Sequence, residues 1–356
     1  MLLLLAASLI AGPTKEPPTY SCGNPCAPPL VELDCQKPCP CASSCNVNSI
    51  NFTGSFIYWQ PHEDGLDYVY KNEAGNAFLN SDGSARRIEF EYQPGFRIGL
   101  GYQPNWLPHI DASWTHYNSK GDDSVEATFP EALFSTWTIP GANLTAATSA
   151  KATWWLNINE IDLLFSIPFK PTDYARLTPF FGASNTWVRQ KMHINLNGGT
   201  STGGAALIVL NDDIDMKNNF WGIGPKLGIK NFWDWGNGFG LFGDGAFSIL
   251  FGKFTLTQHE QVTFEGLTPP TVYLDLENDR YYLARTVLDF NIGLRWERVS
   301  SNEKTRFLIE AGWENLFYFG QNQFRRFIDD SHPGINVSTE GDLTLHGLSL
   351  KAAFAF

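Results

Sequence analysis

Residues 286–297 read TVLDFNIGLRWE, and the apolar residues of this stretch occupy every second position. The apolar series is Leu288, Phe290, Ile292, Leu294 and Trp296. The residues between them are mostly polar or small. Because successive side chains of a β-strand point to opposite faces, this spacing predicts a strand with one apolar and one polar face. Such a strand separates two different media.

Residues 88–102 (IEFEYQPGFRIGLGY) repeat the alternation, and Pro94, which lacks a ladder donor, indicates a bulge within it. Further alternating segments lie near 50–59, 109–117, 154–168, 176–190, 219–230, 239–254, 305–317 and 345–356. The sequence therefore predicts an all-β protein, a transmembrane antiparallel up-and-down β-barrel of about 10 strands, within a range of about 8–12.

The connections between these segments alternate in length. Short ones start at Gln103, Lys170, Asn231 and Val299, and long ones lie near 60–85, 118–153, 191–218, 255–282 and 318–344. Outer-membrane barrels are built in this way, with turns in the periplasm and loops outside. We therefore expect the bacterial outer membrane as the location, with both ends of the barrel on the periplasmic side.

Composition agrees with this fold class. Of the 356 residues, 14% are aromatic and only 17% are charged, yet no apolar run reaches the roughly 20 residues that a membrane-spanning helix needs. A barrel reconciles these facts, because alternation hides its membrane-facing side chains from any averaging window. The net charge of −12 provides no basic footprint, so nucleic acid is not an expected partner.

The amino-terminal region divides into two predicted segments ahead of a barrel over 49–356. Residues 1–12 contain a short apolar run ending in small residues, as in a signal peptide without its basic leader. Residues 13–48 form a disordered, proline-rich periplasmic segment that holds all six cysteines, Cys22, Cys26, Cys35, Cys39, Cys41 and Cys45. In an oxidising compartment these predict disulfides, within the segment or to other envelope proteins. Zinc is the competing interpretation, but paired knuckles and a local histidine are missing.

Aromatic residues are expected where strands meet the two membrane surfaces, because amphipathic rings prefer these interfaces. The residues assigned to such girdles are Trp59, Trp106, Trp187, Trp233, Trp235, Trp296 and Phe356, together with Tyr58 and Tyr117. The alternative is a set of core aromatics in a soluble β-sandwich. The last strand ends in Phe356 and resembles the signal read by the outer-membrane assembly machinery, which is an expected partner besides outer-membrane lipid.

The polar face of the strands predicts the lining of a narrow lumen. The candidate lining residues are Arg97, Asp162, Lys226, Asp244, Arg285, Asp289, Arg295, Glu310 and Lys351, with Glu297, Arg306 and Glu314 also on this face. Because a ten-stranded barrel is narrow, opposite charges are expected to meet across it. Two interpretations stay open, a weakly selective polar pathway for small solutes or ions and a salt-bridged interior that conducts little.

Other functions find less support in the residues. The loops and rims supply His62, Glu63, Asp64, Asp67, His116, His193 and His332. They do not form a nucleophile, base and orienter at recognisable spacing, so we do not expect an enzyme or a cofactor. Asp212, Asp213 and Asp215 lack the full pattern of a calcium loop, so no metal is assigned. Adhesion or structural anchoring by the long loops, with a closed lumen, stays open, and so does a homo-oligomer.

Several aromatic-rich stretches resemble the Legionella-type major outer-membrane protein family, which has relatives in chlamydia-like bacteria. They are FIYWQPHEDGLDYV (56–69), GFRIGLGY (95–102), DASWTHY (111–117), LTPFFGASNTWVRQ (177–190) and Phe220–Phe254. The resemblance runs from about residue 50 to the end. It implies a pore-forming major envelope protein that contributes to surface rigidity. The cysteine segment is not part of this pattern, so rigidity through disulfide cross-links follows from analogy with chlamydial envelopes.

Overall fold

The computed structural model describes residues 49–73, 83–104, 108–142, 144–201, 207–300, 305–329, 331–332 and 334–356. The predicted signal peptide, the cysteine segment and Trp106 lie outside these residues. Among the residues described, no helix is long and apolar enough to cross a membrane.

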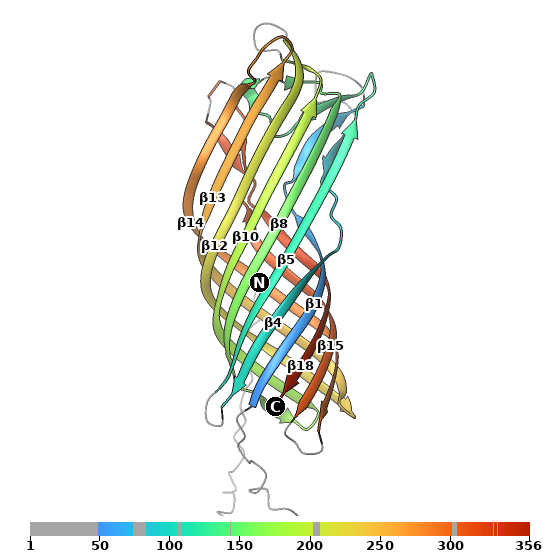
Figure 1. Ribbon diagram of the computed structural model, residues 1–356, viewed down its shortest axis with the longest axis vertical. Coiled ribbons are helices and arrows are strands. Elements are labelled where there is room, and N and C mark those ends of the chain that lie inside the picture. The colour runs from blue at the N-terminus through green and yellow to red at the C-terminus, as the bar shows by residue number, and fades with distance from the viewer. Residues whose placement is uncertain are drawn as a thin grey trace, which may run out of the picture. The chain divides into compact units, whose positions relative to one another are not determined.

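Ten strands form a closed antiparallel barrel, as the sequence predicted (Figure 1). They are β1 (Ser49–Glu63), β4 (Gln93–Gln103), β5 (His109–Glu126), β8 (Ser149–Ser166), β10 (Ala175–Asn197), β12 (Leu207–Gly236), β13 (Phe239–Phe264), β14 (Thr271–Val299), β15 (Arg306–Asn322) and β18 (Gly341–Ala355). Each pairs with the next in this order, and β18 pairs back onto β1, with Asn51 opposite Ala355. The pairing of β18 with β1 closes the sheet, so each of these two strands has a paired neighbour on both sides.

The short connections join strands at one end of the barrel, here called the turn end, and the long ones at the other, the loop end. The tightest turn holds Asn237 and Gly238 between β12 and β13, with φ values of 55° and 80°. Two positive φ angles in a two-residue connection are what a type I′ hairpin requires. The turn expected at Asn231 is therefore misplaced, because the inward and outward alternation continues through Phe232 and Trp233.

Most strands extend further toward the loop end than the sequence suggested. β12 has 30 residues and β14 has 29, against the roughly 9–11 that cross a bilayer. Much of the expected loops at 191–218 and 255–282 is therefore strand. On β10, β12 and β13, most apolar side chains of these extensions point inward and most polar ones outward, which is the reverse of the pattern used to find the strands. Figure 1 shows the extended side of the wall, formed by β5, β8, β10, β12, β13 and β14.

The loop-end connections carry small sheets of their own. β2 (Asp67–Asn72) and β3 (Gly83–Arg87) lie between β1 and β4, and they form a three-stranded sheet with β6 (Ala132–Ser135). β16 (Arg325–Phe327) pairs with β17 (Asn336–Ser338) between β15 and β18. The remaining short elements are β7 (Leu144–Thr145), β9 (Phe169–Thr172), β11 (Thr200–Ser201) and the 3₁₀ turn η1 (Pro140–Ala142).

The outer wall of the turn-end half is apolar. Large hydrophobic side chains are exposed there on strand after strand, for example Phe52, Leu100, Ile223, Ile292 (58% exposed) and Phe354. A soluble protein rarely exposes so continuous an apolar surface. The alternative of a soluble β-sandwich is thereby excluded, since its aromatic residues would point into a core.

Candidate functional site: the charged barrel interior

The centre of the turn-end interior is built around Lys226 on β12. Its Nζ lies 2.8 Å from Glu160 Oε1 and 2.8 Å from Asp162 Oδ2, both on β8. Alternation along β8 places these two carboxylates on the same inward face. Ser184 donates to Glu160 from β10, and Tyr318 donates to the other Glu160 oxygen from β15. One lysine and two acids are thus held in a buried network.

A second pair joins β4 to β15. The Arg97 guanidinium donates to Glu314 Oε1 at 2.8 Å and to Thr115 Oγ1 at 2.8 Å. The guanidinium carbon lies over the Trp59 ring, 5.8 Å from the ring centroid. β4 and β15 are separated by β1 and β18 in the sheet, so this bond crosses part of the lumen.

Nearer the turn end, Glu310 lies between two cations. Arg295 contacts one of its oxygens at 2.5 Å, and Lys351 contacts the other at 3.1 Å. The Arg295 guanidinium also lies 4.8 Å from the ring centroid of Phe232. A further pair, Arg176 with Glu297 at 2.5 Å, lies closer to the turn end than Glu310. The interior is therefore lined by ion pairs from its centre to the turn end.

The structure places all nine predicted lining residues on the inward face and brings six of them into ion pairs. These six are Arg97, Asp162, Lys226, Arg295, Glu310 and Lys351. Asp244 and Asp289 also occupy inward positions, and within the described residues no cation lies at salt-bridge distance from either. Arg285 is higher, with its guanidinium 5.1 Å from the Phe254 ring centroid.

Sequence reasoning missed Glu160, Tyr318 and Arg176. The alternation that identified Asp162 also places Glu160 on the polar face, so this residue could have been found. Tyr318 lay in an expected connection, where alternation was not applied, and Arg176 was the first residue of the predicted strand 176–190, whose polar face was not followed to its end. Their roles depend on strand lengths that the sequence did not give.

The loop-end half of the interior is filled by an apolar plug. Inward residues of the wall, among them Ile57, Trp154 and Met216, pack there against residues from the loop-end connections, among them Val69, Leu133, Trp137 and Phe324. All of these are buried. The plug, meaning this cluster together with β2 and β6, lies on the loop-end side of the ion pairs.

Three connections are tied together at the carbonyl oxygen of Asp67. It accepts hydrogen bonds from Thr136 Oγ1 (2.6 Å), Trp137 Nε1 (2.7 Å) and an Arg326 guanidinium nitrogen (3.1 Å). The same guanidinium nitrogen donates to Gly65 O. The guanidinium carbon lies over the Trp137 ring, 4.3 Å from its centroid. Arg326 therefore joins the β15–β18 connection to the two others.

Residues 136–142 are also held by two buried carboxyls near the loop-end rim. Thr138 Oγ1 donates to Asp212 Oδ2 at 2.8 Å, and the Ile139 amide donates to both oxygens of Glu260 at 3.0 and 3.1 Å. These groups lie beyond the apolar outer wall, which ends on β12 at Trp221. Burial first, and the neighbouring carboxyl second, raises the pKa of Glu260 from 4.5 to about 8. Burial likewise raises the pKa of Asp212 to about 7.

Two of the expected interface aromatics are wrong. Trp59 is 1% exposed and Tyr117 is fully buried, and the Tyr117 hydroxyl donates to Trp59 O inside the barrel. Both residues lie on the inward face of the wall where the interior has become apolar. The other described members lie on the outer wall: Trp187 opposite Trp221, Trp233 and Trp235 near the turn end, Trp296 against Phe239 and Phe307, and Phe356 stacked on Phe52.

The residues considered for catalysis or metal binding are dispersed. His62 lies beside Asp64, His116 bonds Asn159, His193 lies beside Asp215, and His332 pairs with Asp329. Glu63 accepts two bonds from Gln190 inside the plug. Asp212 points inward while Asp213 and Asp215 are on the opposite face of the strand. In the described ranges no group of three or more His, Cys, Asp or Glu side chains could hold a metal ion.

A closed antiparallel barrel with an apolar outer wall and a charged interior defines an outer-membrane β-barrel protein. Residues 42–356 match the family described as Legionella pneumophila major outer membrane protein precursor. Because the match spans most of the chain, the protein belongs to that family, and it is an outer-membrane protein.

Three solved structures that match this chain have low sequence identity to it. The outer membrane protease OmpT from Escherichia coli is 11% identical with a TM-score of 0.39, over 86% of this chain and 96% of that one. Ail of Yersinia pestis, crystallised with the heparin analogue sucrose octasulfate, is 9% identical with a TM-score of 0.23 over 87% and 99%. The Pseudomonas putida toluene transporter TodX is 7% identical with a TM-score of 0.28 over 86% and 89%. No curated protein sequence is similar enough to the chain to count as a relative.

Proposed function

We propose that this protein is a porin-like barrel that provides a narrow polar pathway for small solutes or ions, closed at the loop end by the apolar plug. The turn end faces the periplasm in this proposal, as the alternation of turns and loops predicts. The observation that carries it is the charged, water-compatible interior beneath the plug.

The charges of the turn-end interior are not completely enclosed by protein. The Lys351 side chain keeps 32% of its exposure and that of Arg97 keeps 26%, although both point away from lipid. Asp162 Oδ1, Asp244 Oδ1 and Asn291 Oδ1 are buried without a hydrogen-bond partner among the described residues. Since buried polar atoms are ordinarily bonded to protein or to water, this half of the lumen is suited to hold water.

Stability alone is a weak reason to keep so many charges inside a barrel. Replacing a buried ion pair by well-packed apolar residues is often neutral or stabilising. A polar pathway gives these charges a use, because they would contact the ions or solutes that pass. Mixed signs along the wall, as at Lys226 with Glu160, favour weak selectivity.

The test is single-channel recording of the purified protein in planar bilayers, wild type against an Arg326→Ala/Trp137→Ala variant. These changes remove the stacked pair that joins the three connections, so we expect rare openings in the wild type and frequent ones in the variant. An Arg280→Ala/Tyr282→Ala variant removes the same kinds of side chain, an arginine and an aromatic residue, from exposed positions on the outer wall and serves as the control. Silence of the plug variant at every voltage, while it still migrates as a folded barrel, would favour a closed structural or adhesive barrel instead.

We further propose that the protein has no catalytic role and that the amino-terminal cysteines stiffen the envelope by cross-linking. The scattered histidines favour the first statement, and the clustering of all six cysteines supports the second. Non-reducing against reducing electrophoresis of envelope fractions tests the cross-links. Thiol-dependent oligomers are expected, and identical migration under both conditions would contradict them.

A further inference from the structure

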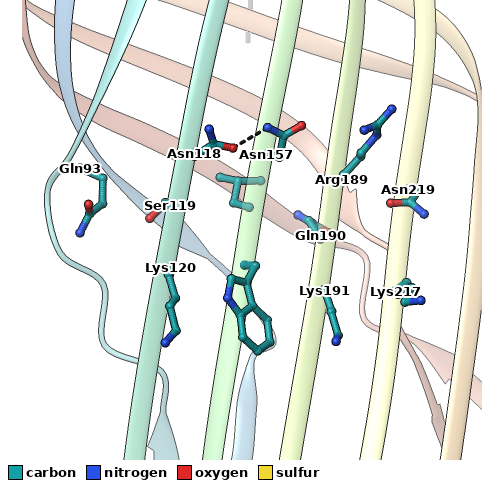
Figure 2. Close-up of a pocket in the computed structure, with 12 residues that line it drawn as sticks. Gln93, Asn118, Ser119, Lys120, Asn157, Arg189, Gln190, Lys191, Lys217 and Asn219 are labelled. Carbon is teal, nitrogen blue, oxygen red and sulfur yellow. Dashed lines mark hydrogen bonds between the residues drawn. The ribbon is translucent and has the colours of Figure 1, made fainter.

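A second charged feature lies on the outside of the barrel and plays no part in the pathway. Lys120 on β5, Arg189 and Lys191 on β10, and Lys217 on β12 surround a shallow hollow in the outer wall (Figure 2). These four residues are called the basic patch. Lys191 is directly opposite Lys217 in the register, and Trp155 of β8 lies between Lys191 and Lys120.

The basic patch lies where the outer wall changes from apolar to polar. The second register row from the basic patch, counted toward the turn end, holds exposed Trp114, Ile161, Ile223 and Phe251. The row between it and the basic patch contains Trp187 and Trp221, opposite each other. Aromatic residues of this kind mark the level where lipid tails meet headgroups. The basic patch is in the two rows immediately beyond, which places it at headgroup height.

Acidic residues are missing from three register rows of the described wall on β5, β8, β10, β12 and β13. Three successive register rows across β5, β8, β10, β12 and β13 hold His116, Asn159, Trp187, Trp221 and Lys253, then Asn118, Asn157, Arg189, Asn219 and Thr255, then Lys120, Trp155, Lys191, Lys217 and Thr257. They contain lysine and arginine but no aspartate or glutamate, although the chain has a net charge of −12. The charge here is opposite to that of the rest of the molecule.

Within the described part of the chain, the patch has little internal neutralisation. Lys191 Nζ lies 3.7 Å from Asp215 Oδ1, and both side chains are about half exposed. Lys120, Arg189 and Lys217 form no ion pair with a described residue. Like charges directly opposite on neighbouring strands, as at Lys191 and Lys217, are destabilising. An external anion would remove this cost.

The patch is also organised to receive such an anion. The ammonium groups of Lys120 and Lys191 lie over the Trp155 ring, 5.8 and 5.3 Å from its centroid. These contacts hold two long side chains in place beside one indole. Asn118, bonded to Asn157 at 2.5 Å, and Asn219 add amide groups around the hollow (Figure 2).

We propose that the basic patch binds the phosphate groups of a membrane lipid in the leaflet at the loop end. Clustered lysine and arginine at a membrane surface recognise anionic headgroups. Position decides in favour of a lipid over a soluble acidic partner, since lipid headgroups surround the wall at this height. A bound phosphate contacts Lys191 and Lys217 together, and the acyl chains run along the exposed apolar row below.

The experiment is a lipid titration of the folded protein in detergent micelles, followed by native mass spectrometry. The probes are a diphosphorylated glycolipid (lipid A) and the same lipid without its phosphates. The patch variant is Lys120→Gln/Lys191→Gln/Lys217→Gln. The control variant, Lys151→Gln/Lys170→Gln/Arg298→Gln, removes equal charge from exposed sites elsewhere. Heat-modifiable migration confirms that each variant is folded.

The wild type and the control variant should bind the phosphorylated lipid with affinities within about twofold of each other. The patch variant should bind it about tenfold or more weakly, and the dephosphorylated lipid should bind equally weakly to all three proteins. Wild-type affinity in the patch variant would overturn the proposal. Equal binding of both lipids, displacement by stoichiometric inorganic phosphate, or a protein dimer lost only in the patch variant would also overturn it.

Discussion

The two halves of the barrel place their apolar and polar side chains on opposite faces of the wall. Near the turn end, β12 points Ile223 and Leu227 outward and Lys226 inward. Nearer the loop end, the same strand points Lys217 outward and Met216 inward. The backbone pairing does not change along the strand. The medium outside the wall therefore decides what the interior contains, with charges behind a lipid-facing wall and an apolar core behind a wall that faces water.

The two interiors are stabilised by different forces. The plug depends on apolar burial, which contributes in proportion to the area removed from water. The ion-paired half depends on each charge keeping its partner, because an unpaired buried charge is costly while a complete pair adds little. Single substitutions should therefore be costly in both halves, but only in the charged half should neutralising the partner residues restore stability.

The largest effect is expected for Trp59→Ala. This side chain is at the junction of the two halves, 1% exposed, with its ring 5.4 Å from that of Tyr117. Removing it leaves a large cavity and should lower the free energy of unfolding by about 3–5 kcal/mol. Tyr58→Ala is the matched control, because the neighbouring side chain is 41% exposed on the outer wall. It should cost about 1 kcal/mol.

Urea titration of the folded-to-unfolded gel shift in detergent measures both variants. Equal losses for Trp59→Ala and Tyr58→Ala would mean that the inward and outward faces are not distinguished at this level. The change from a charged to an apolar interior would then lie closer to the loop end than Trp59.

A somewhat smaller effect is expected for Lys226→Met. The substitution leaves Glu160 and Asp162 buried without their shared cation, which should cost about 3 kcal/mol, limited by protonation of one carboxyl. Adding Glu160→Gln and Asp162→Asn removes the uncompensated charge. This triple variant should recover most of the stability in the same urea titration. If the triple variant is as unstable as the single one, packing rather than charge pairing is what Lys226 contributes.

The sequence predicted the turn-end half well because that half obeys a single rule. Apolar residues at every second position located all ten strands and put Arg97, Lys226 and Glu310 on the inward face. The pairing of Arg97 with Glu314 could not be predicted, because it depends on the curvature of the wall. The sequence did predict that opposite charges meet inside the barrel, without saying which residues pair.

The loop-end half was missed for a physical reason. The alternation continues there, but with most apolar residues inward, so residues 191–218 were expected to be a loop. The same inversion explains the wrong placement of Trp59, which was assumed to face lipid. Beside the plug, Arg326 contacts Gly65 and Trp137, which are far from it in the chain, and no local pattern reports such contacts.

The smallest predicted effect concerns the two carboxyls within the apolar half, Asp212 and Glu260. Both pKa values are raised by burial, so the charged forms are disfavoured while residues 136–142 remain docked. Docking, meaning the attachment of residues 136–142 to these two carboxyls, is therefore strongest when the carboxyls are protonated. It weakens as the pH rises from about 4.5 toward 8. We expect Glu260→Gln to abolish most of this pH dependence, since its amide oxygen still accepts from the Ile139 amide. The difference should be about 1–2 kcal/mol near pH 9.

Hydrogen exchange of the amides in 136–142 measures this docking, expressed as protection relative to the unstructured rate at each pH. Wild-type protection should fall as the pH rises from about 5 to 8, and that of Glu260→Gln should stay nearly constant. Glu265→Gln, on an exposed acid just beyond β13, is the control and should behave as the wild type. Parallel profiles for Glu260→Gln and the wild type would mean that the carboxyl is already ionised at the lower end of this pH range. The loop-end interior would then tolerate charge as the turn-end interior does, and the contrast between the two halves would rest on packing alone.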